Sequence, residues 1–174
     1  SLTLDTSSRG RVEARWKERP LFRYVFEPDV PGRESPRPYF HPLWTLAGEV
    51  LTLYRPHDHP HHHGLSMTCA VLSGQNFWGG PSYLRAEQAY RDVPNWGRQV
   101  HREWLALPAG GQATLEMRER LEWITQAGEV WFREERRIGV GRIDEREGFW
   151  NLDLRFGLTN VSGRELRFGS PTTE

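Results

Sequence analysis

The feature that most constrains the fold is a long alternation of polar and apolar residues in the second half of the chain. Within residues 112–125, Leu115, Met117 and other apolar residues alternate with polar or charged neighbours. Ribbons of the same kind follow at residues 129–140 and 148–160. A period of two is typical of strands with one buried and one solvated face. The pattern therefore predicts a meander of antiparallel strands.

Shorter elements are predicted elsewhere in the chain. Strands are expected at residues 11–17, 21–27, 49–54, 64–72 and 164–168, with a turn at 18–20, and one helix is expected from Tyr83 to Val93. The apolar residues of 49–54 point to both sides, as in a strand covered on both faces. Prolines in residues 27–38 exclude regular structure there. We therefore expect an all-β chain, an antiparallel β-sandwich in which residues 1–174 form a single domain.

The charge balance and the lack of long apolar runs exclude two classes of partner. Lys+Arg and Asp+Glu both number 23, so no basic stripe or acidic tail is expected to attract nucleic acid or an anionic membrane. No apolar stretch approaches the roughly 18–20 residues that span a bilayer, and the polar start of the chain is unlike a signal peptide. We expect a soluble, cytoplasmic protein. Its single cysteine, Cys69, cannot form an internal disulfide.

A histidine-rich segment is the strongest functional signal. Residues 55–64 read Arg-Pro-His-Asp-His-Pro-His-His-His-Gly and contain five of the seven histidines. The segment is internal, so an expression tag does not explain it. Pro56 and Pro60 predict a kinked loop. Several imidazoles in so short a loop predict a chemically active site.

Two kinds of chemistry fit these side chains. His59, His61 and His63 are able to hold a divalent metal such as zinc, iron, nickel or copper, with Asp58 as an oxygen ligand or as an acceptor that orients a ring. Alternatively, an imidazole in a cleft exchanges protons near neutral pH without a metal. The candidates for this catalytic role are His59 and His63, followed by His57 and Asp58. Some of the rings must be structural, because adjacent histidines cannot all converge.

Aromatic and amide residues on both sides of the loop suit a polyhydroxylated ligand. Tyr39 and His41 precede it, and Asn76 and Trp78 follow it beside a pair of glycines. Aromatic faces bind the C–H side of a sugar ring, amides and imidazoles bind hydroxyls, and glycines let a backbone approach a ligand. His101 lies in a charged strand, where a solvated position is expected, and is a lesser candidate. These residues predict a small carbohydrate as the partner.

Several short motifs resemble the PmoA-like family of uncharacterised bacterial proteins. They lie at residues 37–42, 56–64, 76–79, 158–161 and 168–169, and the most specific is the His-Asp-His-Pro-His-His-His-Gly string of 57–64. The resemblance spans about residues 37–174. It implies a soluble bacterial protein, often in sugar-catabolic settings, with a β-sandwich similar to that of galactose mutarotase-like proteins. It implies no established reaction, and the family's label, methane oxygenase, carries little weight for a chain without a membrane-crossing segment. It also implies a chain that continues past Glu174, so we expect the sandwich to be incomplete at its C-terminus and residues 1–174 to be the N-terminal part of a longer domain.

Three functional hypotheses follow. The favoured one is an enzyme acting on a carbohydrate, in which His59 or His63 exchanges a proton with the sugar and Trp78 stacks on its ring. The second is a histidine-ligated metal enzyme, an oxygenase or a hydrolase. The third is a non-catalytic carbohydrate-binding module. Inactivation by chelators would indicate the second hypothesis, and affinity without turnover would indicate the third.

Overall fold

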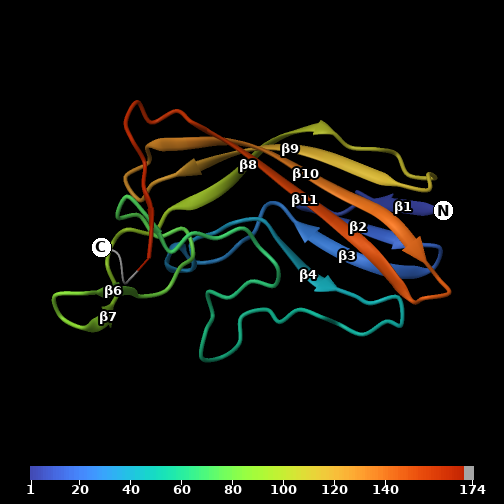
Figure 1. Ribbon diagram of the computed structural model, residues 1–174, viewed down its shortest axis with the longest axis horizontal. Coiled ribbons are helices and arrows are strands. Elements are labelled where there is room, and N and C mark those ends of the chain that lie inside the picture. The colour runs from blue at the N-terminus through green and yellow to red at the C-terminus, as the bar shows by residue number, and fades with distance from the viewer. Residues whose placement is uncertain (171–174) are drawn as a thin grey trace.

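Two antiparallel sheets packed face to face dominate the computed structural model, which describes residues 1–170 (Figure 1). Within this range the chain forms two four-stranded sheets and two small two-stranded sheets, with no α-helix. The predicted all-β antiparallel sandwich is therefore confirmed. No helix in the described part of the chain is long and apolar enough to cross a membrane. The predicted continuation past Glu174 lies outside the described residues.

The first sheet has the strand order β1-β2-β3-β4. Its strands are β1 (Leu2–Asp5), β2 (Arg11–Trp16), β3 (Arg19–Val25) and β4 (Tyr39–Leu43). The strands predicted at residues 11–17 and 21–27 are confirmed as β2 and β3. Their turn, expected at residues 18–20, falls instead at Lys17 and Glu18, where Lys17 has a φ of +53°. As a result Arg19 already belongs to β3.

The second sheet is the predicted meander, with the order β11-β10-β9-β8. Its strands are β8 (Arg98–Ala106), β9 (Leu115–Ile124), β10 (Val130–Asp144) and β11 (Phe149–Asn160). Ile138 on β10 lies opposite Met117 on one side and Leu154 on the other. Because residues directly opposite each other project to the same face, this register collects the apolar side chains on one side of the sheet.

The main core lies between the two sheets. Its buried residues are Leu2, Val12, Ala14, Leu21, Phe22, Tyr24, Phe40 and Leu46 from the first half of the chain, and Leu115, Met117, Ile138 and Val140 from the second sheet. Phe22 meets Phe40 edge-on, with ring centroids 5.2 Å apart. Full burial of a large apolar side chain contributes roughly 1.5–3 kcal/mol. This core therefore fixes how the two sheets pack.

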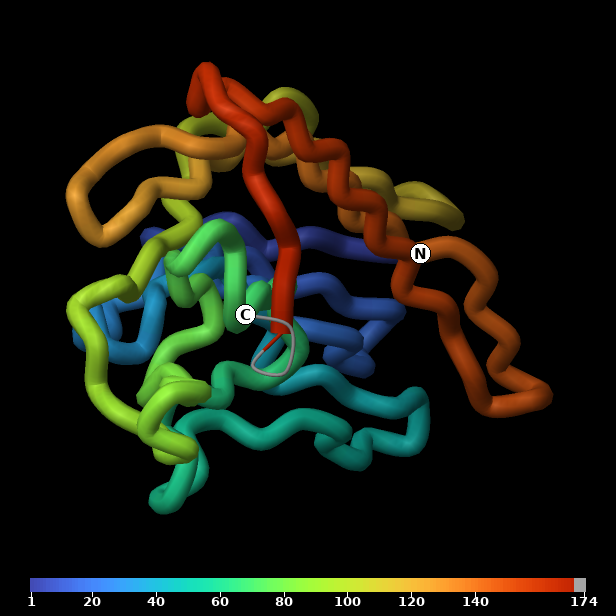
Figure 2. Tube along the Cα trace, turned by 60° about the vertical axis from the view of Figure 1, so that its left-hand side comes forward, coloured from blue at the N-terminus to red at the C-terminus, as the bar shows by residue number. Residues whose placement is uncertain are grey.

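A long, mostly irregular segment, residues 44–97, first runs alongside β4 and then covers one end of the sandwich, and it carries the histidine-rich loop (Figure 2). It contains the short strands β5 (Val71–Leu72), β6 (Ser82–Leu84) and β7 (Ala89–Arg91), while β12 (Phe168–Gly169) pairs with β5. A second buried cluster attaches the segment to the second sheet and consists of Leu72, Phe77, Trp123, Trp131 and Phe132. The proline-rich stretch is irregular, as predicted, apart from a 3₁₀ helix, η1 (Gly32–Glu34).

The predicted helix from Tyr83 to Val93 is wrong. This segment forms a hairpin in which β6 pairs with β7 and Tyr83 lies opposite Tyr90. Gln88, in the connecting turn, has a φ of +51°, which is outside the range of a right-handed helix. The two tyrosine rings meet at 5.2 Å, and this cross-strand contact favours the hairpin over the helix.

Three predicted strands are wrong in extent. Residues 49–54 form only isolated bridges, through Val50 and Tyr54. In residues 64–72 and 164–168, regular strand is limited to Val71–Leu72 and to Phe168. The alternation of residues 49–54 predicts cover on both faces, yet Leu53 is 76% exposed. Side-chain pattern alone does not make a strand without a layer to pack against.

Candidate functional site

The histidine-rich segment forms a tight, kinked loop. Its ends are joined by hydrogen bonds from Arg55 N to the His62 carbonyl and from Gly64 N to the Leu53 carbonyl, of 2.9 and 2.8 Å. Gly64 has a φ of +49°, and a Cβ atom there would lie 2.1 Å from the carbonyl oxygen of Phe40. Only glycine fits so close to β4. The loop is therefore pinned to the edge of the first sheet.

Arg37 holds the base of this loop, a role that the sequence does not reveal. Its guanidinium, with the residue 1% exposed, donates to the carbonyl oxygens of Glu34, Ser35, His61 and Trp78 and to the hydroxyl of Ser66, over 2.8–3.0 Å. Burial lowers the pKa of Arg37 to about 10, so the group remains charged at neutral pH. One cation thus connects the proline-rich stretch, the histidine loop and Trp78.

Three imidazoles of the loop lie close to one another. The ring centroids of His59, His61 and His62 lie 4.6–5.9 Å apart. His62 is nearly parallel to the indole of Trp78, at 5.6 Å and 8°. His59 Nδ1 lies 3.0 Å from a carboxylate oxygen of Asp58, which favours the tautomer with a proton on Nδ1. His57 is exposed.

His63 lies on the inner side of the loop, apart from this group. Its Nε2 is 3.1 Å from the Pro60 carbonyl and 3.8 Å from a carboxylate oxygen of Glu34, and its ring faces Tyr39 and Tyr54. The predicted metal ligands His59, His61 and His63 are therefore not brought together. Within residues 1–170, no group of three or more His, Cys, Asp or Glu side chains is arranged to hold a metal ion.

Glu34 is a buried carboxylate beside His63 that sequence reasoning missed. Only 3% of the residue is exposed, and its Oε1 accepts a hydrogen bond of 2.7 Å from Nε of Arg55. In the described residues, Glu34 Oε2 and the Nδ1 atoms of His61 and His63 are buried without a hydrogen-bond partner. Buried polar atoms without partners are uncommon. They mark this side of the loop as a place where water or a ligand would be bound.

Three histidines of the loop, His61, His62 and His63, favour the neutral form. Burial, reinforced by the neighbouring His62, lowers the pKa of His61 to about 4, and burial, reinforced by Arg37, lowers the pKa of His63 to about 4. The pKa of His62 is also lowered, mainly by burial. At neutral pH these rings can accept a proton or a hydrogen bond, and they carry no charge.

Stability should fall as the pH falls from about 6.5 towards 4. The unfolded imidazoles titrate near 6.5 and those of His61 and His63 near 4, so within this window the unfolded state binds more protons. The contribution is fully present above pH 6.5. Urea unfolding at several pH values measures it, and His61→Asn should flatten the pH dependence, whereas His57→Asn, at an exposed position, should not. An identical slope in His61→Asn would contradict this assignment.

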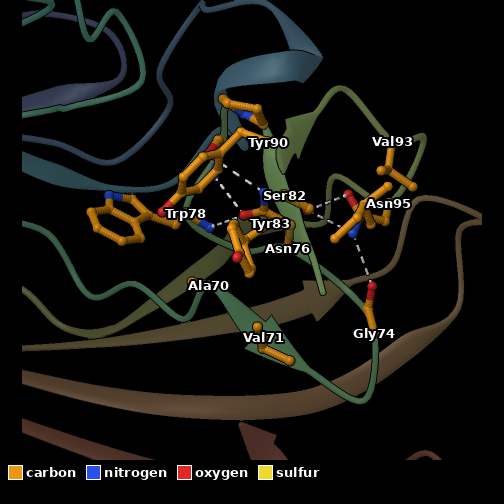
Figure 3. Close-up of a pocket in the computed structure, with 13 residues that line it drawn as sticks. Ala70, Val71, Gly74, Asn76, Trp78, Ser82, Tyr83, Tyr90, Val93 and Asn95 are labelled. Carbon is orange, nitrogen blue, oxygen red and sulfur yellow. Dashed lines mark hydrogen bonds between the residues drawn. The ribbon is translucent and has the colours of Figure 1, made fainter. Parts of the chain in front are cut away.

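A pocket of about 290 Å³ lies next to the loop (Figure 3). Trp78 lies at one end and Asn95 at the other, with Ser82, Tyr83 and Tyr90 also in its wall. Because Trp78 is 41% exposed, its indole is accessible to a ligand. The pocket thus combines aromatic faces with a hydroxyl and an amide, close to the imidazoles.

Two glycines and Asn76 shape the wall between pocket and loop. Cβ atoms at Gly79 and Gly80 would lie 2.6 Å from the backbone of Glu34 and from the ring of His61, respectively. Gly79 therefore makes room for η1 and Gly80 for the histidine loop, rather than for a ligand. The buried Asn76 side chain accepts hydrogen bonds from the amides of Trp78 and Gly79 and donates to the Gly80 carbonyl. Its predicted contact with substrate stays a prediction, since these bonds already use its amide group.

The other predicted ligand-binding residues lie elsewhere. Tyr39 and His41 line a different hollow, on the outer face of the first sheet. His101 was expected to be solvated, and this expectation is wrong. Its Nδ1 lies 2.7 Å from Glu119, with only 9% of its side chain exposed, because Phe26 and Trp104 cover the ring. The predicted set is thus divided among three places.

Comparisons with known proteins give one match. The model of a family of unknown function, DUF6807, matches residues 11–173. Neither the curated proteins nor the solved structures contain a significant match. The similarity to PmoA-like and galactose mutarotase-like proteins therefore stays a prediction. Since the family model covers nearly the whole chain, the protein belongs to DUF6807, a family of unknown function.

Proposed function

We propose that the protein binds a carbohydrate in the pocket beside Trp78 and that neutral histidines of the loop exchange protons with the bound sugar. One observation carries this proposal. Trp78 lines the aromatic pocket and also a hollow of about 240 Å³ that is bordered by His62 and His63. A ring stacked on Trp78 would therefore lie close to imidazole nitrogens.

The chemistry of the pocket suits a neutral sugar. Aromatic rings attract the C–H face of a pyranose, and hydroxyl and amide groups bind its oxygens. Here Trp78, Tyr83 and Tyr90 supply the rings, and Ser82 and Asn95 supply the polar groups. The walls contain no charged side chain among the residues described. This composition favours an uncharged ligand.

The imidazoles are suited to act as bases. An unprotonated ring accepts the proton of a sugar hydroxyl and can return it to another oxygen, which is general acid–base catalysis. The parallel contact with Trp78 places His62 nearest to the proposed sugar. Asp58 would orient His59 from behind, as a carboxylate partner of an imidazole does. His62 thus joins the predicted candidates His59 and His63.

Trp78→Ala should weaken sugar binding by at least about tenfold without unfolding the protein. The indole is partly exposed and contributes stacking rather than core packing, and an aromatic anchor of a binding site contributes on the order of 1–2 kcal/mol or more. Calorimetry with a panel of neutral mono- and oligosaccharides measures the change. Leu53→Ala, at an exposed apolar position outside the pocket, is the matched control.

The same panel separates binding from catalysis. NMR of each sugar with the protein reports isomerisation, epimerisation or anomeric exchange, and His62→Asn should abolish turnover while leaving binding nearly intact. Turnover that disappears with a chelator and returns with zinc, iron, nickel or copper would replace the proton-transfer role with a metal role. If the wild type binds a sugar without any turnover, the protein is a non-catalytic carbohydrate-binding module. No saturable binding of any sugar would refute the proposal.

A further inference from the structure

A second hollow, independent of the proposed sugar site, lies on the outer face of the first sheet. Arg11, Arg23 and Tyr39 each precede a core residue on their strand. Side chains alternate across a strand, so these three point away from the core. The hollow has a volume of about 320 Å³, near the lower end of the roughly 300–1,000 Å³ typical of small-molecule sites. We call it the outer hollow.

A stack of rings forms one wall of the outer hollow. Tyr54 lies against Tyr39 at 5.0 Å and against His41 at 5.6 Å, with both pairs close to parallel. Thr52 holds this arrangement, since its hydroxyl lies 2.8 Å from His41 Nδ1 and accepts from the amide of Leu43. The wall is therefore aromatic and firmly positioned. It offers a flat apolar surface with hydroxyl groups at its edge.

The remaining lining is rich in arginine. Arg9, Arg11 and Arg23 line it, with Glu27 as its one carboxylate among the described residues. Arg23 is already paired with Glu13, at 2.8 Å. Arg9 and Arg11, by contrast, have no carboxylate oxygen within 4.0 Å in residues 1–170. The hollow therefore has an excess of positive charge.

This excess of positive charge is local and does not reflect the net charge of the whole chain. The chain has equal numbers of basic and acidic residues, and many of its other arginines lie in ion pairs, such as Arg33 with Asp92 and Arg102 with Glu122. The backbone also fixes the two unpaired arginines. They flank Gly10, whose carbonyl accepts hydrogen bonds from the amides of Phe26 and Glu27, at 2.9 and 3.1 Å.

We infer that the outer hollow binds a small organic anion, in which a carboxylate or phosphate group meets Arg9 and Arg11 and a ring or short carbon chain lies on Tyr54. Guanidinium groups bind both oxyanions through paired hydrogen bonds. The aromatic wall favours an anion that carries a ring or carbon chain over an inorganic ion. Within the described part of the chain, the outer hollow and the pocket of Trp78 share no lining residue.

Heteronuclear NMR at low salt tests this inference with glucuronate, glucose 6-phosphate, inorganic phosphate and neutral glucose as probes. The two organic anions should shift the amide resonances around Gly10 and Tyr54, and the shifts should saturate. Inorganic phosphate should bind more weakly, and glucose should leave these resonances unchanged. The double variant Arg9→Gln with Arg11→Gln should weaken binding of the organic anions by about tenfold or more, since charge-assisted hydrogen bonds are lost. Added salt should weaken binding as well.

Arg146→Gln with Arg85→Gln removes the same charge outside the hollow and should leave affinity within about twofold. Equal weakening in this control would reduce the effect to general electrostatics and overturn the inference. So would the absence of saturable binding, or anion binding that survives Arg9→Gln with Arg11→Gln. Flotation with anionic vesicles separates a lipid surface from a free metabolite, and binding only to vesicles would also overturn it. Failure of the neutral-sugar panel at Trp78 would not affect these outcomes.

Discussion

Arg37→Ala should destabilise the protein by about 3 kcal/mol or more, among the largest effects of any single change. The substitution removes the donor of four carbonyl groups, those of Glu34 and Ser35, which are buried, and those of His61 and Trp78, which are partly buried. Each buried polar group left unpaired costs roughly 1–3 kcal/mol, less where water enters. Chemical unfolding by urea, followed by circular dichroism and by tryptophan fluorescence, measures the loss.

Two further variants separate the geometry of Arg37 from its charge. Arg37→Lys keeps the charge, but an ammonium group cannot replace the planar guanidinium, which donates hydrogen bonds to carbonyl groups in several directions. It should therefore recover only a small part of the lost stability. Arg33→Ala removes an arginine of the same stretch whose ion pair with Asp92 is solvated, and exposed pairs contribute about 0–1 kcal/mol. Full stability in Arg37→Lys would show that the hydrogen bonds to the loop contribute little.

The long strands of the second sheet could be predicted because their local pattern of polar and apolar residues fits only one kind of element. In β9, charged residues follow Leu115, Met117 and Leu121, and along both β9 and β10 buried positions alternate with more exposed ones. Such a pattern fits only a strand with two different faces. The hairpin at Tyr83 and Tyr90 was missed for the opposite reason. Its apolar residues also fit helical spacing, and the cross-strand ring contact that decides between the two is not visible in a local pattern.

The histidine loop could be located from sequence, whereas its organisation could not. Proximity in sequence predicted that His59, His61 and His63 share one ligand, yet the turn at Pro60 and the anchor at Gly64 direct His63 inward, apart from His59 and His61. Glu34 and Arg37 were missed because charged residues in a proline-rich stretch are ordinarily solvated. Their burial depends on contacts with residues 55–79, which lie far along the chain.

A buried polar network inside the sandwich was equally invisible in the sequence. Arg136 on β10 donates to both carboxylate oxygens of Glu134, to the hydroxyl of Tyr24 and to the side chain of Gln99. Tyr24 in turn donates to Glu119, at 2.6 Å, and Glu119 contacts His101. The network connects β3 of the first sheet with β8, β9 and β10 of the second. It therefore makes the packing of the two sheets depend on one buried arginine.

Arg136→Met should destabilise the protein by about 3–5 kcal/mol, because it leaves the carboxylate of Glu134 buried without its cation. Adding Glu134→Gln to this variant should recover much of the lost stability, since glutamine is uncharged. Its side-chain oxygen can still accept the hydrogen bond that Nε1 of Trp123 donates to Glu134 in the wild type, over 2.7 Å. Urea unfolding of the two single variants and the double variant gives the coupling energy. Arg137→Met, on the same strand and with a solvated partner, should cost less than about 1 kcal/mol. If the double variant were no more stable than Arg136→Met, the loss would come from packing around the arginine stem, and the buried charge of Glu134 would not be its cause.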